Sequence, residues 1–224
     1  IQITLHYNKS MKAVKNLKKE LESFGSEVFL IKADLSIISQ TKKVIPFAYK
    51  MMKGLDCLIN NASVFEKDDL INFNEKSFNK HMAVNLQAPA KLTQDFKKYL
   101  ISKKGNIINI IDQRIFKLTP FFFSYTLSKT GLQALTKTSA MKLAPNIRVN
   151  GIAPGPTIKN KRQTDKHFKK QWKSLILKDK VDPKNICETV KYFINNDNVT
   201  GQIISVDGGQ SLAWQTPDII NTKE

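Results

Sequence analysis

The stretch from Gly105 to Pro145 constrains the fold of this 224-residue chain more than any other part of it. It begins with a largely apolar run, Asn106 to Ile111, which predicts a buried strand. Asp112 follows at the end of that strand, and a long helix is expected to open near Tyr125. Tyr125 and Lys129 are four residues apart, so both side chains project from one face of that helix. A strand and helix packed as one unit would bring a carboxyl, a phenol and an ammonium group into one pocket.

Such a pocket can deliver a proton, which the addition of hydride to a C=O or C=N bond requires at the heteroatom. The Tyr-x-x-x-Lys spacing alone is a weak signal, because each pair could equally be a solvated helix face with a snorkelling lysine. The chain contains three such pairs: Tyr49 with Lys53, Tyr99 with Lys103, and Tyr125 with Lys129. Only the third pair follows a buried-looking strand that ends in an acid, so it is the catalytic candidate.

Strand-like and helix-like patterns alternate along the whole chain. Strands are expected at residues 1–7, 27–35, 55–59, 106–111, 147–152 and 203–206. Helices are expected at 11–24, from the candidate caps Ser36 and Ser39 through Lys53, at 75–100, from Tyr125 onward, and after Pro183. This alternation predicts an α/β fold with a mostly parallel sheet. We expect a single domain over residues 1–224, since nothing marks a second-domain boundary.

Composition limits the classes of partner. The net charge of +17 invites a nucleic-acid interpretation, but 33 of the 36 basic residues are lysines scattered along helix faces, so no nucleic-acid partner is expected. The chain has no apolar run of 18 residues and no signal-peptide pattern, so we expect no membrane partner and a cytoplasmic location. Cys57 and Cys187 fit no metal or redox spacing, so no metal site is expected. Cys57 lies in the apolar run 55–59, which should be buried on both faces, and is expected to be a core thiol.

The ends of the expected strands carry polar or small residues. In parallel α/β sheets, ligands bind outside the carboxyl ends of the strands. The residues collected there are Asn8, Lys9, Ser10, Asp34, Asn60, Asn61, Ala62, Ser63, Asp112, Pro154 and Gly155. We expect them to line one edge of the sheet.

These residues resemble the short-chain dehydrogenase/reductase family in order and spacing, over nearly the whole chain. The matching residues are the Asn60-Asn61-Ala62 stretch, Asn85 in the helix 75–100, Tyr125, Lys129 and Pro154-Gly155. The resemblance implies a Rossmann-type, doubly wound fold and a nicotinamide cofactor. It implies that Tyr125 is the proton donor, that Lys129 is its electrostatic partner and holds the nicotinamide ribose, and that Asn85 helps to carry a proton-relay water.

The resemblance also implies where the cofactor and a second copy of the chain would bind. Cofactor contacts are implied at Asn8, Lys9, Ser10, Asp34, Leu35, Asn61, Ala62, Ser63, Tyr125, Lys129, Pro154, Gly155 and Thr157. The position after the strand 1–7 offers Lys9 and no acid, which suits the 2′-phosphate of NADPH better than the ribose hydroxyls of NADH. A homotetramer is suggested, packed partly through the helices 75–100 and 125–143.

One departure from the family concerns the phosphate loop. The family's glycine-rich loop precedes the strand that corresponds here to residues 1–7, and none of the nine glycines of this chain forms Gly-x-Gly. The amides of that loop cradle the cofactor pyrophosphate at a helix N-terminus. We therefore expect an N-terminally truncated fold that lacks the first βα unit, with two unsatisfied strand edges.

A second departure is Asp112, where most of the family has Ser. An Asp placed 13 residues before the Tyr resembles the pteridine reductase branch, and Phe65 and the segments 6–10 and 206–209 agree with it. In that branch the matching Phe stacks on a pterin, which implies Phe65, Asp112 and Tyr125 as substrate contacts. It implies a small-molecule substrate of pterin or folate type, whose C=N bond is reduced with NADPH. Lys129 is expected to lower the pKa of Tyr125 from its reference value of about 10.

Bland interpretations and alternative functions stay open. Phe65 could be ordinary loop packing, and Asp112 a helix cap or a surface ion pair. A reductase of the same fold could act on a ketone such as a 3-oxoacyl thioester, which a substrate panel would separate. A truncated relative could instead be a non-catalytic binding or scaffold protein. The basic segment 159–180, with nine Lys or Arg against two Asp, could attract an anionic folate tail or form a solvated lid.

Overall fold

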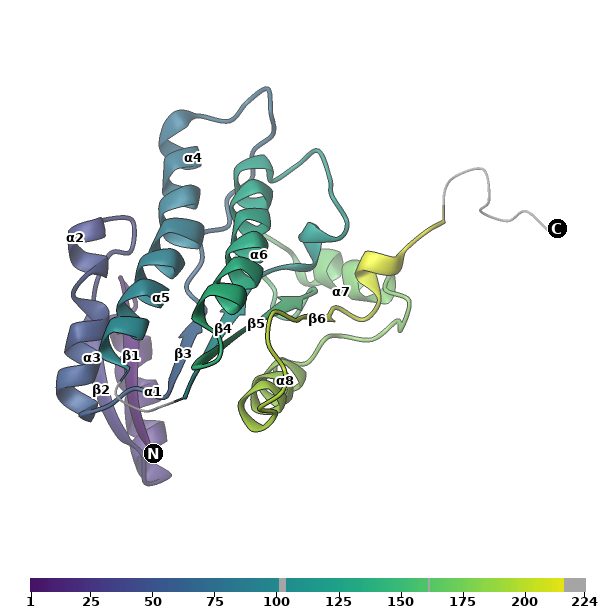
Figure 1. Ribbon diagram of the computed structural model, residues 1–224. Coiled ribbons are helices and arrows are strands. Elements are labelled where there is room, and N and C mark those ends of the chain that lie inside the picture. Colours follow the sequence, from purple (N-terminus) through teal and green to yellow (C-terminus); the bar gives the residue numbers. More distant parts are fainter. Residues whose placement is uncertain (101–103, 161, 216–224) are drawn as a thin grey trace.

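The computed structural model describes residues 1–100, 104–160 and 162–215, and strands alternate with helices along them (Figure 1). The first part contains β1 (Gln2–Tyr7), α1 (Met11–Ser23), β2 (Glu27–Lys32), α2 (Ile38–Thr41), α3 (Val44–Met52), β3 (Cys57–Asn60), α4 (Glu75–Met82), the π-helical turn η1 (Ala83–Gln87) and α5 (Ala88–Tyr99). The second part contains β4 (Gly105–Ile110), the 3-10 turn η2 (Gln113–Ile115), α6 (Phe123–Leu143), β5 (Ile147–Pro154), α7 (Asp165–Lys173), α8 (Pro183–Asn195), β6 (Ile203–Val206) and η3 (Gln210–Leu212).

The strands form two parallel sheets with cores on both faces. The order β3-β4-β5-β6 makes a four-stranded sheet, and β1 and β2 make a separate pair. Neighbouring residues of β4 point to opposite faces, so Ile107 packs with Phe96 of α5 on one side and Ile108 with Phe193 of α8 on the other. The expected Rossmann-type, parallel α/β architecture is confirmed.

The edges of β1 and β3 correct one expectation about burial. Among the described residues β1 pairs only with β2, and β3 pairs only with β4. The expectation that the run 55–59 is buried on both faces is therefore wrong, and Ile59 is 45% exposed. Cys57, expected as a core thiol, is exposed as well, because nothing described covers this side of an edge strand.

Three element boundaries also differ from expectation. Neither Ser36 nor Ser39 caps a helix: α2 follows Ile37, and Ser36 instead donates its hydroxyl to Asp34. The single helix expected up to Lys53 is split in two before Val44. The basic segment contains an unpredicted helix, α7, whose first turn is capped by Thr164 through a hydrogen bond from the amide of His167.

No helix in the described ranges combines the length and the apolar character that crossing a membrane requires.

Candidate active site

Asp112 and Tyr125 are in direct contact where β4 ends and α6 begins. One carboxylate oxygen of Asp112, Oδ1, accepts a hydrogen bond of 2.8 Å from the amide of Arg114 and thereby caps η2. The other oxygen, Oδ2, accepts a 2.8 Å hydrogen bond from the hydroxyl of Tyr125. Tyr125 is 6% exposed. Asp112 is thus both a cap and the direct partner of the phenol, so the two interpretations raised for it are not exclusive.

Lys129 lies one helical turn beyond Tyr125 and completes the group. Its side chain is 2% exposed, and its ammonium donates a 2.8 Å hydrogen bond to the carbonyl of Ile110 at the end of β4. Its Nζ atom is 5.7 Å from the ring centroid of Tyr125. Strand end and helix therefore bring together the three side chains that the spacing predicted.

Burial shifts the pKa of all three groups. It raises the pKa of Asp112, although the hydrogen bonds from Arg114 and Tyr125 oppose this. Burial and the adjacent charge of Asp112 raise the pKa of Tyr125 well above its usual value. Burial lowers the pKa of Lys129 to about 8, against the opposing effect of the Asp112 charge.

The expectation that Lys129 lowers the pKa of Tyr125 is therefore wrong. The group that touches the phenol is a carboxylate, which accepts a hydrogen bond and so stabilises the protonated form of Tyr125. The ammonium of Lys129 bonds a main-chain carbonyl instead. At neutral pH Tyr125 keeps its proton and is held ready as a donor.

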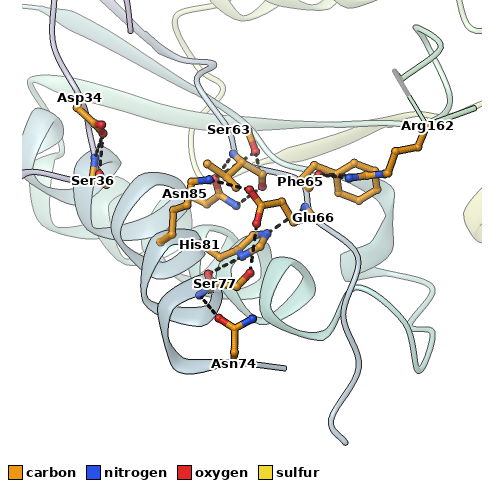
Figure 2. Close-up of polar contacts among 12 residues, drawn as sticks. Asp34, Ser36, Ser63, Phe65, Glu66, Asn74, Ser77, His81, Asn85 and Arg162 are labelled. Atoms are coloured by element: carbon orange, nitrogen blue, oxygen red, sulfur yellow. Dashed lines mark hydrogen bonds and ion pairs between the residues drawn. The ribbon is translucent and has the colours of Figure 1, made fainter. Parts of the chain in front are cut away.

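Asn85 braces the site from the π-helical turn η1, which interrupts the helix expected over 75–100. Its Oδ1 accepts a hydrogen bond of 2.8 Å from the amide of Val64 and one of 3.2 Å from the hydroxyl of Ser63 (Figure 2). Its Nδ2 donates to the carbonyl of Val64 at 2.9 Å and to the hydroxyl of Ser128 at 3.0 Å. These four bonds use the full capacity of the amide. The side chain has no capacity left for a relay water, so any relay contribution has to come from the main chain of η1.

His81 is a site residue that sequence reasoning missed. It is fully buried one turn before Asn85, and its ring lies edge-on to Tyr125 with 6.4 Å between centroids. Nδ1 must donate to the carbonyl of Ser77, at 2.8 Å, so Nε2 is the acceptor for the amide of Glu66 at 3.2 Å (Figure 2). The i, i+4 spacing of His81 and Asn85 was the available signal. Both side chains hold the loop that follows β3.

That loop places Phe65 beside Tyr125. The ring of Phe65 lies 4.6 Å from that of Tyr125 in an edge-on arrangement. It also stacks on Phe122 at 4.5 Å, with 12° between the ring planes. Phe122 was not predicted: it precedes α6 with φ of 60°, a strained backbone for an aromatic residue. Phe65 thus lies beside Tyr125, while its stacking on Phe122 also fits ordinary loop packing, so its contact with a substrate stays a prediction.

The candidate cofactor residues form two groups at the carboxyl ends of the strands. In the first group, Asp34 accepts hydrogen bonds of 2.9 and 2.6 Å from the amide and hydroxyl of Ser36, which lower its pKa. Asn8 and Lys9, at the end of β1, lower the same pKa to a smaller extent, so they lie nearby. Ser10 and Leu35 flank this group, the first at the start of α1 and the second after Asp34.

The second group follows β3 and β5. Asn61, Ala62 and Ser63 are exposed directly after β3. A Cβ atom on Gly155 would lie 2.6 Å from the Cα of Asp207, so only glycine fits after Pro154. Thr157 closes this turn by donating to the carbonyl of Gly155 at 3.0 Å. Within the described residues no hydrogen bond or ion pair joins this group, or the Asp112–Tyr125 pair, to the first group, and no cluster of side chains could hold a metal ion.

A parallel α/β sheet with a buried Tyr–Lys pair at its strand ends defines a Rossmann-type oxidoreductase. Residues 1–211 match the family model described as enoyl-(acyl carrier protein) reductase. The chain belongs to the short-chain dehydrogenase/reductase family.

Two kinds of similar protein bear on the choice of substrate. The 3-oxoacyl-[acyl-carrier-protein] reductase FabG of Buchnera aphidicola is 31% identical over 209 residues, which is 91% of this chain and 84% of that protein. FabG of Thermotoga maritima is 28% identical over 87% of this chain and 81% of its own length. Among solved structures, FolM alternative dihydrofolate reductase 1 from Brucella canis, complexed with NADP, has a TM-score of 0.94 and 39% identity over 98% of this chain and 87% of that chain. FolM from Brucella suis, also with NADP, has a TM-score of 0.93 and 38% identity, over 98% of this chain and 88% of that one.

Proposed function

We propose that this protein reduces a C=N bond of a pterin or dihydrofolate-type substrate with NADPH. The observation that carries the proposal is the 2.8 Å hydrogen bond between Tyr125 and Asp112, with Phe65 beside them. A carboxyl group suits the ring and exocyclic N–H groups of a pterin, and an aromatic ring suits its flat face. The similarity to the two FolM structures supports the same substrate class.

The residues present fit a nicotinamide cofactor with a 2′-phosphate. Lys9 supplies a positive charge at the end of β1, and the described residues place no carboxylate within ion-pair distance of it. Lys129 would hold the nicotinamide ribose, and the exposed Asn61–Ser63 segment and the Gly155 turn would line the same site. When bound, NADPH supplies the hydride, and the chain supplies positioning and the proton.

The proton reaches the substrate from the Tyr125–Asp112 pair. Tyr125 is protonated at neutral pH, and Asp112 orients its hydroxyl. Burial raises the pKa of Asp112, so this carboxyl takes up a proton more readily than an exposed one and can assist Tyr125 in donation to the ring nitrogen. The charge of Lys129, retained below about pH 8, balances the negative charge left behind.

A substrate panel with the full-length protein tests the proposal. We expect NADPH-dependent turnover of dihydropterins or dihydrofolate, loss of this turnover on Asp112→Ala, and a raised KM on Phe65→Ala. Asp112→Ser is the matched control, because it restores the residue that most of the family has at this position. Robust turnover of acetoacetyl thioesters, with none of any pterin, would overturn the substrate assignment and leave the reductase assignment in place.

The second candidate is a 3-oxoacyl thioester reductase, which the FabG relatives favour. A ketone needs one proton donor at oxygen and no carboxylate, so Asp112→Ser should preserve or improve that activity. The third candidate is a non-catalytic scaffold. A scaffold protein would show neither turnover nor NADPH binding, which distinguishes it from both reductases.

The pyrophosphate-binding amides and the assembly stay predictions. The open edges of β1 and β3 support a further glycine-rich βα unit in the complete protein, and chain 1–224 alone should then bind NADPH only weakly. Micromolar binding to residues 1–224 by calorimetry would refute this.

A homotetramer through α4–α5 and α6 is supported by Leu127 and Met141, which are 43% and 73% exposed on α6, and ultracentrifugation would test it. Fractionation of the cells that make the protein would test the cytoplasmic location.

A further inference from the structure

Arg114 carries a guanidinium group that the proposed chemistry does not use. It lies two residues after Asp112, with its Cζ atom 4.7 Å from the ring centroid of Phe122 and 5.8 Å from that of Phe65. Its amide bonds Asp112, but its guanidinium makes no hydrogen bond and has no carboxylate within 4 Å in the described parts of the chain. A half-buried, always-charged group beside Phe65 and Phe122 thus has five donors to offer.

Arg162 provides a contrast at the same aromatic ring. Its Cζ atom is 5.2 Å from the centroid of Phe65, and Nη1 and Nη2 both donate to the carbonyl of Phe65 at 3.0 Å (Figure 2). This guanidinium is engaged in holding the loop that carries Phe65. The two arginines therefore have the same charge beside the same ring, but in the described residues the guanidinium of Arg162 is held by the carbonyl of Phe65, whereas that of Arg114 makes no hydrogen bond.

We propose that Arg114 is a specificity-determining residue that binds a carboxylate on the tail of the substrate. The enzyme would then select a pterin conjugated to an acidic tail, as in dihydrofolate, over an unconjugated dihydropterin. This inference rests on the proposed pterin reductase function and names the substrate within that class.

The position of Arg114 fits this role. A pterin ring held by Asp112 and Tyr125 would direct its tail outward past the Phe65–Phe122 pair, because these rings lie beside Tyr125. Arg114 stands over that pair. Stacking on aromatic rings leaves the edge of a guanidinium, where its N–H groups point, open to a planar carboxylate.

A second cation lies beside the same ring as Arg114, because the Cζ atom of Arg162 is 5.2 Å from the centroid of Phe65. Glu66, the next residue in the chain, pairs with Lys80 at 2.7 Å, so its charge is balanced. Asp112 feels the charge of Arg114, which lowers its pKa, but its two oxygens bond an amide and a phenol. A charge-assisted bidentate pair at this half-buried position should contribute roughly 10–100-fold to affinity.

The test compares dihydrofolate with dihydrobiopterin, whose side chain is neutral, in the full-length protein with NADPH. Arg114→Gln should raise the KM for dihydrofolate by roughly 10–100-fold and leave the KM for dihydrobiopterin within about twofold. Any effect of the lost charge on Asp112 changes kcat for both substrates alike, so the ratio of their kcat/KM values isolates the tail. Arg114→Lys, which keeps the charge but not the planar fork, should recover part of the ratio.

Arg162→Gln is the matched control, because it should impair both substrates equally by loosening Phe65. In the wild type, salt should raise the KM for dihydrofolate, and Arg114→Gln should remove this dependence. Equal losses for both substrates on Arg114→Gln, in a variant with unchanged Tm, would overturn the specificity role and leave the reductase intact. No turnover of either pterin by the wild type would instead remove the reductase function, and this inference with it.

Discussion

The two sheets of this molecule differ in how completely they build their part of the site. In the four-stranded sheet, β4 has a neighbouring strand on each side. Near its end, Tyr125 donates a 2.8 Å hydrogen bond to Asp112, and Lys129 donates one of 2.8 Å to the carbonyl of the last strand residue. The β1–β2 pair carries Asn8, Lys9 and Asp34 at half-exposed or exposed ends, where the hydrogen bonds are local to one turn.

The difference in burial separates two kinds of group, buried groups with shifted pKa values and an exposed charge. In the closed, four-stranded half, burial is the main cause of the raised pKa values of Asp112 and Tyr125 and of the lowered pKa of Lys129. In the open β1–β2 half, hydrogen bonds from Ser36 lower the pKa of the little-buried Asp34 instead. Recognition of a charged cofactor tail requires an accessible charge, and Lys9 is exposed just after β1. The predictions below therefore separate chemistry in one half from cofactor choice in the other.

The largest effect is expected in the closed half. Tyr125→Phe should lower kcat by about 10²–10⁴-fold with little change in folding, because it removes a proton donor and no bulk. Steady-state kinetics and a thermal melt would measure both quantities.

Two other tyrosines serve as matched controls for that substitution. Tyr49 and Tyr99 pack against each other at 5.3 Å beside the core. Of their Tyr-x-x-x-Lys partners, Lys53 ends α3 and Lys103 lies outside the described residues. Tyr49→Phe and Tyr99→Phe should be nearly silent, and losses like those of Tyr125→Phe would mean that the effect is structural.

In the open half, Lys9→Glu should change cofactor choice rather than chemistry. A carboxylate in place of the ammonium should weaken NADPH by about 10–100-fold more than NADH, because only NADPH carries the 2′-phosphate. The ratio of the two Kd values, with kcat at saturation, measures the effect. An NADH preference in the wild type, or equal weakening of both cofactors, would contradict the assignment.

A smaller effect is expected in the closed half when the pH is raised. Lys129 is charged below and neutral above its lowered pKa of about 8, so kcat/KM should fall about tenfold per pH unit above that value. Asp112 raises the pKa of Lys129, so Asp112→Ser should move this limb to lower pH. Lys129→Arg should abolish the limb in whatever activity remains, since arginine does not titrate there. A limb that persists in Lys129→Arg belongs to another group.

The closed half was also the more predictable one. A buried strand, an acid at its end and a helical i, i+4 pair are local patterns, so the convergence of Asp112, Tyr125 and Lys129 could be inferred from spacing. The hydrogen bond between Asp112 and Tyr125 could not, because it depends on how the loop between them folds. Because that hydrogen bond was not predicted, the direction of the Tyr125 pKa shift was predicted wrongly.

Contacts made by loops were not predictable for the same reason. Phe122, Arg114 and His81 reach the site through chain reversals that carry no periodic signal, and the position of the π-helical turn at Asn85 is set by its four side-chain bonds. Burial of β3 was overestimated because an apolar run does not reveal whether a neighbouring strand covers it.

The smallest effect concerns two glycines that allow close packing near the site. A Cβ on Gly155 would meet the Cα and carbonyl of Asp207 at 2.6 and 2.9 Å, and backbone cannot move aside cheaply. A Cβ on Gly131 would meet only the end of the Leu86 side chain, at 2.7 Å, which can change rotamer. Gly155→Ala should therefore cost about 1–3 kcal/mol of stability, and Gly131→Ala about 1 kcal/mol less than that. Urea unfolding with unchanged slopes would measure both, and a larger cost at Gly131 would show that helix packing around α6 is the tighter constraint.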